Sequence, residues 1–263
     1  MDLNLKGKRA LVTGSSSGIG EAIAKCLASE GAHVMVQGRK RAELQRVVKE
    51  ITALGGIAHY VEGDLTNDEE AMHIAEKTLQ TFPQLDILIN NAGAFPQRGW
   101  LEGTPQDWLD LLNLNVVSMV RMIQAFLPQM KTLGWGRIIQ IASVAGRTPS
   151  PFLPDYGATK AANINMTLSL SKDLAGTGIN VNTVSPGPIV TAGVKELFHK
   201  MALENGWGTD WKEIEKKVIG EMLPNLVGRF GIPNEVGRLV TFLASPAADF
   251  ITGANYRIDG GQS

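Results

Sequence analysis

Tyr156 and Lys160 lie four residues apart in the segment Tyr-Gly-Ala-Thr-Lys, and together they are suited to proton transfer. Residues i and i+4 share one face of a helix, so the phenol and the ammonium are neighbours there. A free tyrosine ionises near pH 10, whereas an adjacent ammonium favours the phenolate and lowers that pKa. Ser143, which ends a β-branched run thirteen residues earlier, supplies a hydroxyl to hold a carbonyl or alcohol oxygen. These residues predict acid–base chemistry at such an oxygen.

A second set of residues is suited to binding phosphate. Thr13-Gly14-Ser15-Ser16-Ser17-Gly18-Ile19-Gly20 follows an apolar strand and opens a helical stretch. Glycines allow a tight turn and a close approach to a pyrophosphate, while the helix N-terminus offers unpaired N–H groups. A glycine cluster alone is often only a turn, but its place between a strand and a helix predicts a dinucleotide site. A Tyr–Lys pair at this spacing is common on solvated helix surfaces, but its occurrence together with a phosphate-binding loop favours a catalytic role for Tyr156 and Lys160.

The end of the second predicted strand selects the cofactor. A dinucleotide without a 2′-phosphate usually meets an acidic residue there, but this chain reads Gln37-Gly38-Arg39-Lys40-Arg41. Arg39 is suited to a bidentate pair with a 2′-phosphate, which favours NADP(H) and leaves NAD(H) as the alternative. The other interpretation is that these basic residues form a solvated start of a helix.

Asp64 and Leu65 end the third predicted strand, beside the expected adenine site. The Asp64 carboxylate is suited to accept a hydrogen bond from the adenine amino group. Asp is equally common as a helix N-cap, a role open to Asp64 or to nearby Asn67. The residues leave both roles open.

Short β-branched runs alternate with amphipathic stretches along the chain, and several runs have apolar residues on both faces of the strand alternation. This pattern predicts an α/β fold, a doubly wound Rossmann-type architecture with a seven-stranded parallel sheet flanked by helices on both faces. Residues 1–263 are expected to form one domain with a substrate lid at about 191–223. The predicted strands are Arg9–Thr13, Ala32–Gln37, Ile57–Glu62, Leu85–Asn90, Arg137–Ala142, Ile179–Val184 and Asn255–Ile258; the predicted helices are 18–30, 40–54, 67–80, 105–133, 156–175 and 233–245.

Composition excludes several classes of protein. With 25 Lys+Arg against 26 Asp+Glu, the chain lacks the basic excess typical of general nucleic-acid or anionic-membrane binding. No uninterrupted apolar run approaches about 18 residues, and the N-terminus has no apolar signal-peptide core.

The single cysteine, Cys26, cannot form an internal disulfide, so we expect a cytoplasmic protein with Cys26 inert in a helix. The four scattered histidines have no zinc-ligand spacing, so no metal site is expected.

Taken together, the motifs resemble those of the short-chain dehydrogenase/reductase family, in its compact single-domain branch. The resemblance covers essentially the whole chain in the expected order, and it implies an oxidoreductase acting between CH–OH and C=O. The motifs that carry it are Thr13–Gly20, Asn90-Asn91-Ala92-Gly93, Asn115, Ser143, Tyr156-x-x-x-Lys160 and Pro186-Gly187.

The resemblance implies a role for each of four catalytic residues. Tyr156 is the proton donor or acceptor, and Ser143 positions the substrate oxygen. Lys160 binds the nicotinamide ribose and lowers the pKa of Tyr156, while Asn115 holds a water that links Lys160 to solvent. A hydride passes between the nicotinamide and the carbonyl carbon.

The resemblance also implies the cofactor contacts. Asn91-Ala92-Gly93 lines the adenosine side, and Pro186-Gly187, Ile189 and Thr191 shape the nicotinamide pocket. Many NADP-dependent relatives carry a basic residue just before the second glycine, where this chain has Ser17, so Arg39 is left as the main 2′-phosphate ligand. The full expected set is Thr13, Gly14, Ser16, Ser17, Gly18, Ile19, Gly20, Arg39, Asp64, Leu65, Asn91, Ala92, Gly93, Tyr156, Lys160, Pro186, Gly187, Ile189 and Thr191.

The sequence indicates less about the substrate than about the cofactor. The loop Val144–Asp155 holds three prolines and is expected to be a stiff pocket wall. The apolar content of the lid favours a medium-sized or hydrophobic carbonyl substrate, although its apolar residues also suit packing of the lid onto the body of the protein. The resemblance implies a homotetramer, with a dimer as the alternative, through the last strand and the helices near 105–133 and 156–175.

The leading hypothesis is an NADP(H)-dependent carbonyl reductase or alcohol dehydrogenase. An NAD-dependent polyol, sugar-acid or hydroxysteroid dehydrogenase is the alternative, which Gln37-Gly38-Arg39 disfavours. A dinucleotide-binding regulator without turnover is disfavoured because all four catalytic positions are filled. No feature supports a nucleic-acid module.

Overall fold

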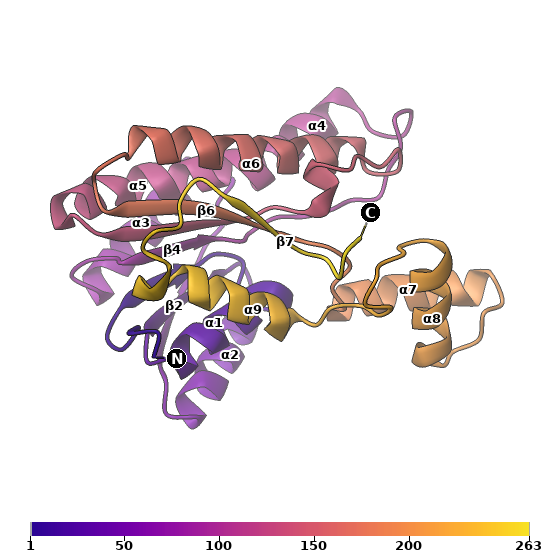
Figure 1. Ribbon diagram of the computed structural model, residues 1–263, viewed down its shortest axis with the longest axis horizontal. Coiled ribbons are helices and arrows are strands. Elements are labelled where there is room, and N and C mark those ends of the chain that lie inside the picture. The colour runs from indigo at the N-terminus through magenta and orange to yellow at the C-terminus, as the bar shows by residue number, and fades with distance from the viewer. Residues whose placement is uncertain (1, 263) are drawn as a thin grey trace.

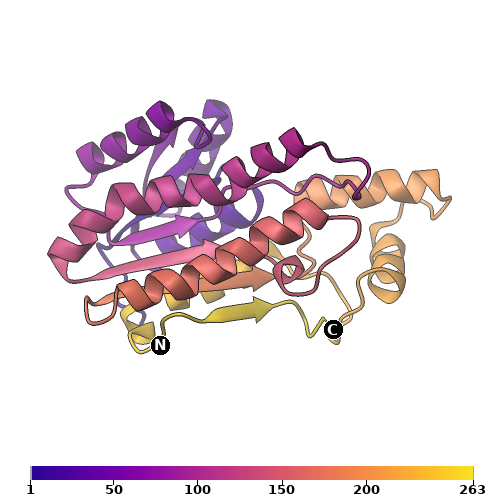
Figure 2. The same cartoon turned by 90° about the horizontal axis from the view of Figure 1, so that it is seen from above.

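The computed structural model describes residues 2–262 and is built on one parallel sheet of seven strands (Figures 1 and 2). The strand order is β3-β2-β1-β4-β5-β6-β7, so the chain winds outward in both directions from the β1–β4 pair. This confirms the predicted fold class. The strands are β1 (Arg9–Val12), β2 (His33–Gly38), β3 (Ile57–Glu62), β4 (Ile87–Asn90), β5 (Gly136–Ile141), β6 (Ile179–Pro186) and β7 (Asn255–Ile258).

Helices cover both faces of the sheet because successive strand residues point to opposite sides. In β4, Ile87 and Ile89 join the apolar cluster beneath α1, α2 and α9, whereas Leu88 joins the cluster beneath α3, α5 and α6. The helices are α1 (Gly18–Ser29), α2 (Arg41–Ala53), α3 (Asp68–Thr81), α4 (Pro105–Leu112), α5 (Ser118–Leu133), α6 (Pro154–Asp173), α7 (Ala192–Glu204), α8 (Trp211–Glu221) and α9 (Pro233–Leu243); η2 (Val144–Gly146) and η3 (Pro246–Ala248) are short 3₁₀ turns.

The helix predicted over 105–133 is not continuous. A π-helical turn, η1 (Asn113–Val117), separates α4 from α5 and contains Asn115, which is fully buried. Such wide turns often occur at functional sites. The sequence pattern missed this interruption because both flanking segments keep their helical periodicity.

The same helical stretch, Pro105–Leu133, is long and apolar enough to cross a membrane by length and composition. Core helices of soluble proteins have these properties too. Met122, Phe126 and Met130 of α5 are buried in the cluster against the sheet, so one face of this stretch packs on the core.

Helices α7 and α8 form an appendage at one end of the molecule, beyond the carboxyl ends of the strands (Figure 1). They pack on each other through a small apolar cluster that includes Phe198, Ile214 and Phe230. The Trp211 ring lies 5.8 Å from that of Phe230, and Trp207 packs against the same cluster. Most of the apolar residues expected to line a pocket therefore hold this appendage together, whereas Met222 is exposed.

Candidate active site

The site is built where the strand order reverses, between the carboxyl ends of β1 and β4. Ligands of doubly wound sheets bind in this crevice. The Asn91 side chain donates to the main-chain oxygens of Thr13 and Gly14, at 2.9 and 3.1 Å. The Thr13 hydroxyl in turn accepts from the amides of Asn91 and Ala92, at 2.9 and 3.0 Å. Two predicted motifs 70 residues apart in sequence thus form one rigid unit.

The glycines of the Thr13–Gly20 loop are required by close contacts. Gly14 has a φ of +61°, and a Cβ there would lie 2.8 Å from the Cα of Ala92. A Cβ at Gly20 would lie 2.4 Å from the Gly14 oxygen and 2.5 Å from the Asn91 amide nitrogen. Only glycine lets the start of α1 approach β4 this closely.

The start of α1 is suited to a pyrophosphate. The N-cap residue, Ser17, makes no capping hydrogen bond with its side chain. The first N–H groups of a helix lack partners within the helix, so those of Gly18, Ile19 and Gly20 suit phosphate oxygens. The geometry therefore fits a dinucleotide.

Gln37 supports this loop, a role that sequence reasoning missed. Its side chain is 2% exposed, accepts from the Gly14 amide at 3.1 Å and donates to the Gly63 oxygen at 2.8 Å. The sequence shows only that no acidic residue stands in this segment, whereas the Gln37 side chain ties the loop to the end of β3. A glutamine that ends an otherwise apolar strand was the available clue.

Arg39 projects from the end of β2 into solvent, with 70% of its side chain exposed and its Nη1 3.6 Å from Asp64 Oδ2. The preceding Gly38 is packed against Ser16, where a Cβ would lie 3.2 Å from the serine hydroxyl. Ser16 and Arg39 therefore flank one open corner of the site, a position suited to a phosphate on the adenosine ribose.

The structure excludes one of the two roles left open for Asp64, that of a helix N-cap. The N-cap of α3 is Asn67, whose side chain accepts from the Glu70 amide at 3.0 Å, so Asp64 does not cap this helix. Although burial acts to raise the pKa of Asp64, hydrogen bonds from Thr66 and the nearby Arg39 lower it. The Leu65 side chain is buried in the core, so only its main chain is available to a ligand.

Tyr156 and Ser143 meet across the gap between α6 and the end of β5. Burial raises the pKa of Tyr156, and the nearby side chain of Ser143 acts in the opposite direction. The Ser143 hydroxyl also accepts from the Ala145 amide at 3.2 Å, which orients it.

Lys160 lies beside this pair, with Nζ 5.6 Å from the centre of the Tyr156 ring. Nζ donates to the main-chain oxygen of Ile141 at 2.9 Å, and burial lowers the pKa of Lys160 to about 8. Burial disfavours the charged form of each group, so it raises the pKa of Tyr156 and lowers that of Lys160.

Asn115 is locked in place by the main chain of Ala94. Its amide accepts from the Ala94 N–H and donates to the Ala94 oxygen, each at 2.9 Å, and it also donates to Thr159 at 3.0 Å. A Cβ at Gly93 would lie 2.9 Å from Asn115 Oδ1 and 3.6 Å from Lys160 Nζ. Gly93 therefore lies beside both Asn115 and Lys160, the two residues that the resemblance linked through a water.

The predicted nicotinamide-side residues lie at the end of β6. The Gly187 amide donates to the Ile258 oxygen at 3.0 Å, and Ile189 is buried and bridges to Gly231. Thr191 caps α7 by accepting from the Val194 amide. A Cβ at Gly18 would lie 3.3 Å from the Thr191 methyl, so the start of the appendage touches the phosphate loop.

Two further expectations concern groups outside this site. Within residues 2–262, no group of three or more His, Cys, Asp or Glu side chains is arranged to hold a metal ion. Cys26 is partly buried between α1 and α9, and its thiol donates to Asn234 Oδ1 at 3.0 Å. Burial raises the pKa of this thiol, which disfavours the reactive thiolate.

The fold and the site together define a class. A Rossmann-type sheet with a glycine-rich loop at its switch point and a Ser–Tyr–Lys group beside it is the arrangement of a dinucleotide-dependent oxidoreductase.

The comparison with known proteins gives the family. A family model described as short chain dehydrogenase matches residues 8–202. YvrD of Bacillus subtilis (strain 168), described as an uncharacterized oxidoreductase, is 38% identical over 261 residues, covering 99% of this chain and 98% of its own. FabG of Aquifex aeolicus (strain VF5), a 3-oxoacyl-[acyl-carrier-protein] reductase, is 37% identical over 262 residues, 99% of each chain.

A solved structure agrees with these relatives. The L-sorbose reductase from Gluconobacter frateurii, in complex with NADPH and L-sorbose, superposes with a TM-score of 0.94 at 33% identity, covering 99% of this chain and 98% of that one. This chain belongs to the short-chain dehydrogenase/reductase family and is an NAD(P)-dependent oxidoreductase.

Proposed function

We propose that this protein is an NADP(H)-dependent reductase of carbonyl compounds, or catalyses the reverse alcohol oxidation, with Tyr156 as the general acid or base. One observation carries the proposal: the side chains of Tyr156, Ser143 and Lys160 lie close together at the carboxyl end of the sheet, beside a loop shaped for a dinucleotide. The NADPH held by the L-sorbose reductase supports the choice of cofactor.

The cofactor is held from both ends. The start of α1 binds the pyrophosphate, while Ser16 and Arg39 bind the 2′-phosphate. The adenosine lies against Asp64, the main chain of Leu65 and Asn91–Gly93, and the nicotinamide end lies against Lys160 and the segment 186–191. When bound, NADPH supplies the hydride that reduces the carbonyl carbon.

The protein's own residues handle the proton. In reduction, the Tyr156 hydroxyl donates its proton to the substrate oxygen as negative charge develops there. The Ser143 hydroxyl donates a second hydrogen bond to the same oxygen, so the two form a small oxyanion site. Lys160 and Asn115 then return a proton to Tyr156 through water that Asn115 holds. The side chains of Ser143, Lys160 and Asn115 are already oriented by main-chain contacts.

The rim of the site favours a medium-sized, apolar substrate. Large apolar side chains are exposed on the two loops that flank Tyr156, and the Phe95 ring lies 6.2 Å from that of Tyr156. Helices α7 and α8, which begin at the phosphate loop, form the substrate lid of this single domain. The exposed loop residues are Phe95, Trp100, Leu101 and Phe152.

The test is a titration of the purified protein with NADPH and, in parallel, NADH, followed by the fluorescence of its five tryptophans. Tighter binding of NADPH is expected, followed by NADPH oxidation with a carbonyl panel of hydrophobic ketones, 3-oxoacyl thioesters and L-sorbose. Tighter binding of NADH would overturn the cofactor assignment. Binding without turnover, unchanged in Tyr156→Phe, would support a regulator instead.

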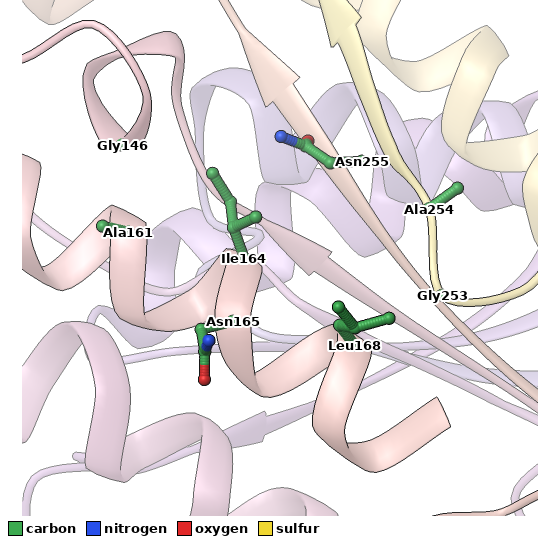
Figure 3. Close-up of a pocket in the computed structure, with 8 residues that line it drawn as sticks. All are labelled: Gly146, Ala161, Ile164, Asn165, Leu168, Gly253, Ala254 and Asn255. Carbon is green, nitrogen blue, oxygen red and sulfur yellow. The ribbon is translucent and has the colours of Figure 1, made fainter. Parts of the chain in front are cut away.

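The proposal includes a homotetramer in the cytoplasm, with a dimer as the alternative. Strand β7 is an edge of the sheet, and edge strands are prone to pair with another chain. A pocket beside it is lined by Ile164 and Leu168 of α6 together with Gly253, Ala254 and Asn255 (Figure 3). Both features suit a subunit interface, and analytical ultracentrifugation tests it: a monomer would contradict the assembly and leave the chemistry standing.

A further inference from the structure

A buried carboxylate that the proposed chemistry does not use directly precedes Tyr156. Asp155 is 1% exposed, and its Oδ1 accepts from the Tyr156 amide at 2.7 Å. The N-cap of α6, Leu153, has no side-chain oxygen, and Pro154 occupies the first helical position. Asp155 therefore satisfies an N–H group of the first turn that would otherwise lack a partner, where negative charge is favoured.

The other oxygen of this carboxylate is held by an arginine from a distant loop. Arg98 Nε donates to Asp155 Oδ2 at 2.7 Å across 57 residues of sequence. The same guanidinium donates through Nη1 to Asp107 Oδ1 at 2.6 Å and through Nη2 to the Asp107 main-chain oxygen at 3.1 Å. Arg98 is thus engaged with protein carboxylates rather than free to meet an anionic substrate.

Asp107 is itself fixed. Its carboxylate accepts from the Thr104 amide at 2.9 Å and its own amide donates to the Thr104 hydroxyl at 3.2 Å, which forms the capping box at the start of α4. The same carboxylate also accepts from the Thr104 hydroxyl at 2.6 Å. These hydrogen bonds from Thr104, with the charge of Arg98, hold the pKa of Asp107 below its usual value, so it stays ionised. Arg98 therefore joins three elements: its own loop, the first turn of α4 and the first turn of α6.

We propose that Arg98 and Asp155 are positioning residues for the proton transfer: they clamp the loop 94–104 to the first turn of α6 and so fix the Tyr156 phenol relative to Ser143. This inference rests on the proposed role of Tyr156. The clamp also sets Phe95, on the same loop, against the Tyr156 ring. Neither charged group touches the reacting atoms, so the effect lies in orientation.

Breaking the clamp is expected to lower the catalytic rate and leave the affinity for NADPH nearly unchanged. Small misplacements of a catalytic group cost up to about 100-fold in rate. Arg98→Gln leaves the Asp155 carboxylate buried without its partner, and Asp155→Asn removes the charge but keeps an oxygen for the Tyr156 amide. Each is expected to lower kcat at least about tenfold while the Kd for NADPH changes less than about twofold.

The chain offers a matched control pair at the opposite end of the sheet. Arg9 Nε donates to Asp86 Oδ2 at 2.6 Å, and Asp86 is 3% exposed, so this pair is equally buried and far from Tyr156. Arg9→Gln is expected to lower Tm and leave kcat unchanged. Arg98→Lys is expected to recover only part of kcat, because an ammonium cannot grip both carboxylates as the guanidinium fork does.

Hydrogen–deuterium exchange tests the clamp without turnover. Faster exchange over 94–104 and 154–160 in Arg98→Gln, and not in Arg9→Gln, is expected. Unchanged exchange there, or a kcat equal to that of the wild type, would overturn the inference, as would an NADPH affinity that falls as far as kcat. Failure of the proposed function has a different signature: wild-type protein without NADPH-dependent turnover, whatever the exchange shows.

Discussion

The cofactor side and the substrate side of the site are constructed differently. On the cofactor side, main-chain atoms and small residues meet at fixed distances, as where Asn91 and Thr13 join β1 to β4. On the substrate side, exposed apolar side chains such as Trp100 and Phe152 stand on loops tied down at a few points, one of them the Arg98 clamp. The comparison teaches that the proposed cofactor side is built from main-chain geometry, whereas the proposed substrate side is built from exposed side chains on loops.

The largest effect is expected from Tyr156→Phe, which should lower the catalytic rate without changing the affinity for NADPH. Tyr156→Phe removes the proton that reaches the substrate oxygen, and loss of general acid–base catalysis typically costs about 100- to 10,000-fold in rate. The Kd for NADPH is expected to stay unchanged because the ring and its packing remain. Steady-state kinetics and fluorescence titration measure the two. A variant that retains most of its kcat would disprove the role of Tyr156.

The second-largest effect is expected from a substitution on the cofactor side of the site. Gly20→Ala places a methyl group 2.4 Å from the Gly14 oxygen, so the phosphate loop must move away from Asn91. Such overpacking costs about 1–3 kcal/mol, and we expect a lower Tm with a weakened affinity for NADPH.

Gly220→Ala is the control for this substitution. Gly220 lies in α8 with nothing within 4 Å of an added Cβ, so alanine there is expected to raise Tm slightly. Equal affinities for NADPH in the two variants would show that the loop does not bind the pyrophosphate.

A smaller effect is expected on the preference of the protein for NADPH over NADH. Hydrogen bonds to charged groups contribute about 1.5–3 kcal/mol, so Arg39→Ala is expected to weaken NADPH binding about 10- to 100-fold and leave NADH binding nearly unchanged. Arg41→Ala, which removes an exposed ion pair with Glu62, serves as the control. Parallel losses for both dinucleotides would mean that Arg39 does not read the 2′-phosphate.

The smallest effect is a difference in pH dependence between the two directions. Reduction needs protonated Tyr156 and oxidation needs the phenolate, so the raised pKa keeps reduction active above neutral pH while oxidation increases as the pH rises. Lys160 loses its charge as the pH rises through about 8, so NADPH binding is expected to weaken over that range. Initial rates in both directions measure this, and identical profiles would contradict it.

Much of the molecule was predictable because its signals are local. Runs with apolar residues on both faces of the alternation, such as Arg137–Ala142, identify buried parallel strands, and glycines between a strand and a helix identify the phosphate loop. The predicted bounds differ mainly at the ends, as in β4, which begins at Ile87 rather than Leu85. The π-turn at Asn115 and the internal packing of α7 and α8 carried no such local signal.

The sequence by itself determined the fold class, the order of the strands along the chain and the identities of Ser143, Tyr156 and Lys160, because hydrophobic period and residue chemistry are properties of short segments. Only the tertiary structure decided what these segments touch. It placed Gln37 under Gly14, made Asn67 rather than Asp64 the cap of α3, and joined Arg98 to Asp155. Contacts between residues far apart in sequence depend on how the layers pack, and no local pattern records that packing.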